Sequence, residues 1–264
     1  VWASTNQDAK FGILPFILTS VYGTAGAILI GVPVGFFTAV YLAKEAPPKL
    51  RGIVEEAVKI ISNGTLQPHL LVTLEEVAVG YVLAGVVGVA LALLWTLFPK
   101  TEAYGSVFCS AIMAIPKTAI LPILVLWFGI GFQSKVVLIF LFSVFQILYN
   151  TLTGAKQCKE EYLKVARVFR ASRVQTVFGV ILPAALPSMF NGFRIAAATA
   201  MTGVVFSEMQ SAKGGLGYLL RESQELLNTS RMFFLIILVT LISVLLTKLV
   251  TAVEYMICHR WRKV

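Results

Sequence analysis

Long apolar runs dominate this sequence and restrict the folds open to it. They stand at about residues 12 to 43, 70 to 97, 107 to 129, 135 to 154, 187 to 207 and 232 to 257. A helix needs roughly 20 apolar residues to cross ~30 Å of hydrocarbon, and several runs reach that length. Because lipid offers backbone amides no hydrogen-bonding partner, each run is expected to be helical. The sequence therefore predicts an all-α, polytopic membrane helix bundle of about six spans.

The charge content agrees with a bilayer setting. Only 13% of the residues are charged, about half the share usual in soluble domains. The net charge of +9 raises the question of a nucleic-acid partner. The lysines and arginines sit mainly in short loops between the runs, however, where the positive-inside bias accounts for them. We therefore expect a membrane and no nucleic acid.

The residues that enzymes and metal sites need are scarce. The cysteines and histidines are scattered without ligand spacing, at Cys109, Cys158, Cys258, His69 and His259, so no metal motif is present. No Gly-x-x-x-x-Gly-Lys-Ser/Thr phosphate loop and no Gly-x-Ser-x-Gly elbow occurs. The sequence predicts no catalytic residue, no metal and no cofactor in this chain, so energy for any active transport must arrive through another subunit.

The densest cationic loop predicts the orientation in the membrane. It lies between the fourth and fifth runs and holds Lys156, Lys159, Lys164, Arg167, Arg170 and Arg173. The positive-inside rule places this loop in the cytoplasm. The basic tail at 259–263 follows two further spans, so the C-terminus is expected in the cytoplasm too. Lys135 then falls outside, while the charges of the first segment disagree with the pattern.

Three charged residues near the apolar runs are candidates for a solute path. Lys117 stands between Pro116 and Pro122, which predict a kinked or broken helix, and it is the best placed to meet an anion. Arg194 is about 10 Å along its helix from the loop end and is expected to reach the surface. Glu208 is also expected at the surface, with a solute contact as the alternative.

Two further acids, Glu75 and Glu76, enter the second run and are expected to cap it.

Short motifs from residue 66 to the C-terminus carry a resemblance. They are Pro68-His69-Leu70, Thr73-Leu74, Leu121-Pro122, Leu126-Trp127-Phe128-Gly129-Ile130-Gly131, Asn150-Thr151, Ala171-Ser172-Arg173, Gln175-Thr176, Leu182-Pro183-Ala184-Ala185-Leu186-Pro187, Gly192-Phe193-Arg194 and Gly215-Leu216-Gly217-Tyr218. Together they resemble the permease subunits of bacterial ABC importers, most closely the nitrate, sulfonate and taurine group. The resemblance implies a five-helix permease core at residues 66–264 in the bacterial inner membrane.

The same resemblance implies partners and a docking loop. An ABC ATPase, which binds ATP and magnesium, would dock on a cytoplasmic loop; a periplasmic or lipid-anchored binding protein would deliver the solute; and a second permease chain, expected as a homodimer, would complete the path. The family loop reads Glu-Ala-Ala, three residues, Gly, nine residues, Ile-x-Leu-Pro. In the loop at about 155–183, this frame is occupied by Lys164, Val165, Ala166, Arg170, Val180, Ile181, Leu182 and Pro183.

Two residues depart from the family frame. Lys164 replaces an acid and reverses the charge offered to the ATPase, where like charges are costly. Arg170 replaces the glycine, and a left-handed turn there would cost a larger residue roughly 1 to 2 kcal/mol. We therefore expect Arg170 to change the turn and both residues to alter docking.

The first 62 residues resemble a different group, the opening of phosphate importer permeases. The match rests on Phe11-Gly12-Ile13-Leu14-Pro15-Phe16, Val32-Pro33-Val34-Gly35 and Ala46-Pro47-Pro48-Lys49-Leu50-Arg51. We therefore separate residues 1–65, a membrane helix with an amphipathic connector at 50–62, from the core at 66–264. A fusion or chimera near residues 62–66 would explain the disagreeing charges; an ordinary N-terminal sixth helix is the alternative.

The functional hypothesis is an ATP-driven importer permease for a small anionic solute such as a sulfonate, nitrate or taurine. A secondary transporter or channel without an ATPase is the main competitor, since it would use similar apolar spans. An inactive fusion product is a further alternative, and a membrane-bound enzyme is disfavoured by the missing motifs.

Overall fold

The computed structural model describes residue 33 and residues 52–259. The chain divides into two units, residues 1–55 and 56–264, and the fold below is that of the second unit. Apart from residue 33, the predicted first span at 12–43 lies outside the described residues, as does most of the basic tail. The predicted fusion and the boundary at residue 65 stay predictions. Residues 52–62 form a helix, and the role of an amphipathic connector predicted for residues 50–62 stays a prediction.

The described part of the chain consists of helices joined by short turns, without a strand. The long helices are α2 (Leu66–Leu97), α5 (Phe132–Lys156), α8 (Leu182–Ser211) and α10 (Thr229–His259). Shorter elements are α3 (Pro99–Ala114), α4 (Lys117–Phe128), α6 (Glu160–Val168), α7 (Arg173–Thr176), the π-helix η1 (Val177–Ile181) and α9 (Leu216–Glu225). The all-α prediction is confirmed.

Four helices of the described region are long and apolar enough to cross a membrane, and α3 with α4 adds a fifth span if the pair counts as one. The two helices of this pair meet at 93°. The break falls at Ile115 and Pro116, where the chain is extended. Pro122 lies inside α4 and does not interrupt it. The predicted break in the third run is therefore confirmed, and Pro116 marks it.

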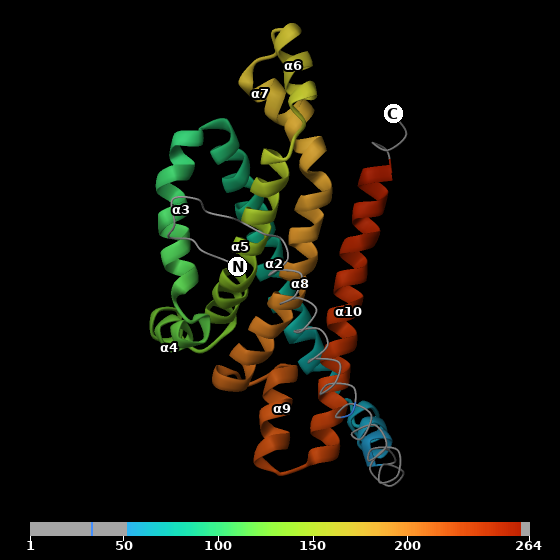
Figure 1. Ribbon diagram of the computed structural model, residues 1–264. Coiled ribbons are helices and arrows are strands. Elements are labelled where there is room, and N and C mark those ends of the chain that lie inside the picture. Colours follow the sequence, from blue (N-terminus) through green and yellow to red (C-terminus); the bar gives the residue numbers. More distant parts are fainter. Residues whose placement is uncertain (1–32, 34–51, 260–264) are drawn as a thin grey trace. The chain divides into compact units, whose positions relative to one another are not determined.

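The centre of the bundle is the packing of α5 against α2 and α8, with α10 beside α8 and the α3–α4 pair beside α2 and α5 (Figure 1). Glycines lie where the backbones of α2 and α8 come closest to α5. A Cβ at Gly88 of α2 would lie 3.0 Å from Val144 O, and one at Gly192 of α8 would lie 2.9 Å from Gln146 O. Small residues let membrane helices pack backbone to backbone, so α5 is held from both sides.

Candidate functional site

The loop between α5 and α8 projects from one end of the bundle (Figure 1) and carries exposed apolar side chains. On α6, Ala166 is buried, whereas Tyr162 and Val165 are exposed. Val168 and Phe169, at the end of this helix, are 79% and 80% exposed. Contiguous apolar surface on a polar element is typical of interaction sites. The loop therefore exposes apolar surface at its end of the bundle, and the predicted docking of an ATPase there stays a prediction.

The turn after α6 keeps the left-handed conformation that favours glycine, although Arg170 occupies it. Arg170 has φ +52°. Its N–H donates to Arg167 O at 3.0 Å, and the Ala171 N–H donates to Ala166 O at 2.9 Å. These two bonds form a Schellman motif, the helix ending that glycine usually provides. The expectation that Arg170 changes the turn is therefore wrong: the turn is retained at a cost of roughly 1 to 2 kcal/mol.

The loop is joined to α8 without a flexible break. Ser172 Oγ accepts a hydrogen bond from Gln175 N at 3.2 Å, and Gln175 Oε1 accepts one from Ser172 N at 2.8 Å, forming a capping box for α7. Val180 lies in η1, and Leu182 and Pro183 form the first turn of α8. The ring of Pro183 fixes its φ near the helical value. The loop therefore continues into a membrane span.

Lys164 lies on the exposed side of α6. Its Nζ is 4.0 Å from Glu160 Oε2, and both side chains are well exposed. Surface pairs of this kind contribute little to stability. Lys164 therefore presents its charge to whatever covers α6, and the predicted effect of the reversed charge on docking stays a prediction.

A second candidate site is buried near the opposite end of α8. Glu208 is fully buried. Its Oε1 accepts a hydrogen bond from Thr73 Oγ1 of α2 at 2.7 Å, and its Oε2 accepts one from Gly217 N at 2.7 Å. Thr73 Oγ1 also accepts a bond from Leu216 N at 2.9 Å. Two side chains thus hold the backbone where α9 begins.

An ion pair extends this site to α5. Lys135 Nζ donates to Glu76 Oε1 at 2.5 Å, and both side chains are buried. The Glu76 carboxyl also lies close to the carboxyl of Glu208. We call Thr73, Glu76, Lys135 and Glu208 the buried polar cluster. It joins α2, α5, α8 and the start of α9.

A glycine turn closes over this cluster. Gly215 has φ +110°, and a Cβ there would collide with the Glu208 carboxylate. Its N–H donates to His69 Nδ1 at 2.9 Å, and the His69 ring stacks on Tyr218 with centroids 5.7 Å apart. The motifs Pro68-His69-Leu70 and Gly215-Leu216-Gly217-Tyr218 therefore meet in space.

These findings overturn two expectations. Glu208 is not at the surface. Glu76 does not cap α2, because the helix begins more than two turns earlier at Leu66. The cluster was missed, although Thr73 and Glu76 are three apart and so share a helix face, and buried charges inside spans normally pair with one another.

The three predicted solute-path residues do not converge. Lys117 Nζ, at the start of α4, lies 5.2 Å from the Phe142 ring centroid, and no carboxylate of the described region pairs with it. Arg194 instead donates to Glu254 Oε2 at 2.7 Å, linking α8 to α10. Glu208 belongs to the buried polar cluster. Lys117 is therefore the one of the three whose charge stays available to an anion.

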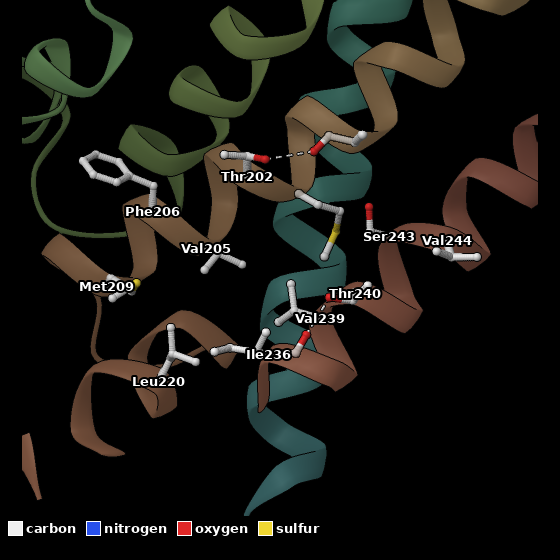
Figure 2. A pocket seen from close by; sticks show the side chains of 12 residues that line it. Thr202, Val205, Phe206, Met209, Leu220, Ile236, Val239, Thr240, Ser243 and Val244 are labelled. Carbon is white, nitrogen blue, oxygen red and sulfur yellow. Dashed lines mark hydrogen bonds between the residues drawn. The ribbon is translucent and has the colours of Figure 1, made fainter. Parts of the chain in front are cut away.

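A groove of about 470 Å³ between α8, α9 and α10 (Figure 2) is mainly apolar. Two of its hydroxyls bond within their own helices: Thr202 donates to Ala198 O and Thr240 to Ile236 O. No charged side chain lines it. The groove therefore suits apolar contact and offers no site for an anion.

Comparison with known proteins shows which proteins have similar sequences and folds. Residues 84–263 match the family described as binding-protein-dependent transport system inner membrane component. An aliphatic sulfonates transport permease protein of Bacillus subtilis is 28% identical over 250 residues, covering 95% of this chain and 86% of its own. The taurine transport system permease protein of Escherichia coli is 30% identical over 184 residues, covering 70% and 67%.

Among solved structures, an inward-facing conformation of the MetNI methionine ABC transporter is similar. Its TM-score is 0.62 at 22% identity, covering 72% of this chain and 95% of the compared chain. At this identity the likeness shows the fold alone.

Proposed function

Because this chain belongs to the family of binding-protein-dependent transport system inner membrane components, we propose that it is the permease subunit of an ATP-driven ABC importer. It would form the translocation path for a small anionic solute such as a sulfonate, nitrate or taurine. A separate ATPase would bind ATP and magnesium and dock on α6, and a solute-binding protein would deliver cargo. A second copy of the permease would complete the path in the inner membrane, with the C-terminus in the cytoplasm.

The exposed apolar surface of α6 carries the proposal. Tyr162, Val165, Val168 and Phe169 lie on a loop at the end of the bundle, next to charged side chains rather than on a membrane span. Burying such side chains in a partner is favourable by roughly 1.5 to 3 kcal/mol each. A secondary transporter or channel would have no use for this surface. An ATPase that must push on α8 would use it directly.

Lys117 supports the anionic class of solute. It stands at the 93° break between α3 and α4. In the described region its ammonium contacts two aromatic rings, those of Phe142 and Phe145. A membrane cation without a counter-ion attracts an anion more strongly than a surface cation does, because the local dielectric constant is low. The names of the sulfonate and taurine relatives agree with this class.

Docking can be tested by placing a charge on α6. Phe169→Glu removes an apolar contact and adds an unpaired acid, and it is expected to weaken ATPase binding at least about tenfold. The measurement is co-purification with the cognate ATPase and ATP hydrolysis stimulated by loaded binding protein. Leu226→Glu is the matched control, since Leu226 is an exposed apolar residue next to α9. Equal effects of the two variants would refute docking on α6.

The solute class has its own test. Lys117→Gln is expected to raise KM for sulfonate or taurine uptake while ATPase binding stays unchanged. Unaltered KM would exclude Lys117 from the path. Growth rescue by the full chain on a sulfonate as sulfur source would exclude the inactive fusion product.

A further inference from the structure

A groove of about 340 Å³ lies where α2 passes into α3, facing the turn from α6 to α7 and η1. Arg167 and Arg173 line its polar side, and Leu97, Val177 and Ile181 line its apolar side. It is separate from the apolar surface of α6, from Lys117 and from the buried polar cluster. None of the functions above uses it.

No acid of the described region balances the positive charges of the two arginines. Two neighbouring lysines do have acids within reach: Lys156 Nζ lies 2.5 Å from Glu102 Oε1, and Lys164 pairs more loosely with Glu160. Among the described residues no carboxylate lies within ion-pair distance of Arg167 or Arg173. Guanidinium groups present planar forks of donors that match the oxygens of a phosphate. The groove therefore has the donors for a phosphate group and an apolar wall beside them.

The groove borders the end of an apolar helix. α2 ends at Leu97, and Pro99 and Lys100 follow it. A cation directly after a long apolar helix is typical of the level of the lipid headgroups. Basic pockets between helices at this level bind anionic headgroups. A soluble phosphate would use the arginines alone, whereas a phospholipid also uses the apolar wall.

We propose that this groove binds one anionic phospholipid, with its phosphate on Arg167 and Arg173 and the start of its acyl chains against Leu97, Val177 and Ile181. The bound lipid bridges the α2–α3 junction and the α6–α7 turn. It thereby steadies the loop that carries the exposed surface of α6. This role is independent of the solute and does not require that an ATPase docks there.

The test uses the full chain in nanodiscs of phosphatidylcholine, with and without phosphatidylglycerol. Association of spin-labelled phosphatidylglycerol is measured for Arg167→Gln/Arg173→Gln. The matched control is Lys159→Gln/Lys164→Gln, which removes the same charge from the same loop outside the groove. The arginine double variant is expected to bind the lipid about tenfold or more weakly, and the lysine double variant to bind it nearly as wild type does.

Four outcomes would overturn the proposal. Equal losses in both double variants would show diffuse attraction, and unchanged binding in the arginine variant would exclude the groove. If inorganic phosphate in phosphatidylcholine discs stabilises the wild type against thermal unfolding as much as phosphatidylglycerol does, the ligand is a soluble anion. Loss of ATPase binding without loss of lipid binding would assign the arginines to the partner protein. Thermal unfolding in phosphatidylcholine alone shows whether the variants are folded.

Discussion

Replacing Thr73 with valine hardly changes the volume of the side chain, yet it should destabilise the protein strongly. The Thr73 hydroxyl is buried and serves two groups at once: it donates to Glu208 Oε1 at 2.7 Å and accepts from Leu216 N at 2.9 Å. Valine has nearly the same shape, so packing is kept while both bonds are lost. The substitution therefore isolates the hydrogen bonds from the packing of α2.

The expected magnitude follows from the groups left without partners. A buried donor or acceptor that loses its partner costs about 1 to 3 kcal/mol. Thr73→Val leaves two such groups, so the free energy of unfolding should fall by about 2 to 6 kcal/mol. Thr73→Ser keeps the hydroxyl and loses one methyl group, for which about 1 kcal/mol is expected.

The assay is denaturant unfolding of the purified protein in detergent, followed by tryptophan fluorescence. Thr240→Val is the control, because the Thr240 hydroxyl is exposed and bonds only to Ile236 O of its own helix. This variant should stay within about 0.5 kcal/mol of wild type. If Thr73→Val costs no more than Thr240→Val, the buried polar cluster does not hold the start of α9 as described.

Three further substitutions test other contacts. Arg170→Gly should relieve the left-handed turn by about 1 kcal/mol and slow amide exchange there about fivefold; unchanged exchange would contradict the strain. Gly192→Ala places a Cβ 2.7 Å from a side chain of α5 and should cost about 1 to 3 kcal/mol in unfolding experiments, whereas Gly179→Ala, with nothing within 4 Å, should be nearly neutral. Arg194→Gln should destabilise by about 1 kcal/mol, and Arg194→Glu with Glu254→Arg should recover most of the loss of Arg194→Glu alone; no recovery would show that the pair is not formed.

The sequence predicted the elements of the fold because their causes are local. Apolar length predicts the spans. Pro116 and Pro122 together predicted a kinked or broken helix, since proline removes a backbone donor, but the sequence did not show that the break falls at Pro116 while Pro122 stays within α4. The docking loop was predicted from the spacing of family motif residues within one short segment, residues 164–183. Arg170 was misjudged because the hydrogen bonds that end α6 hold the turn whatever residue occupies it.

The buried polar cluster could not be predicted in the same way. Thr73 and Glu208 are 135 positions apart, and Glu76 and Lys135 are 59 apart. Their meeting depends on how α2, α5 and α8 are rotated about their axes, and small residues at the crossings decide that rotation through contacts of backbone atoms. One sequence shows that each charge must find a partner, but it does not show which one.

Helix α8 connects the two candidate sites mechanically. It begins at the loop that carries α6 (Figure 1). Glu208 lies near its other end, and the helix has 30 residues, or ~45 Å, in all. Gly192 packs α8 against α5 along the way. Pro187 lies inside α8 close to the loop, so part of a displacement of the loop is absorbed by bending there. Any displacement that passes Pro187 reaches the buried polar cluster, which also holds α2, α5 and the start of α9.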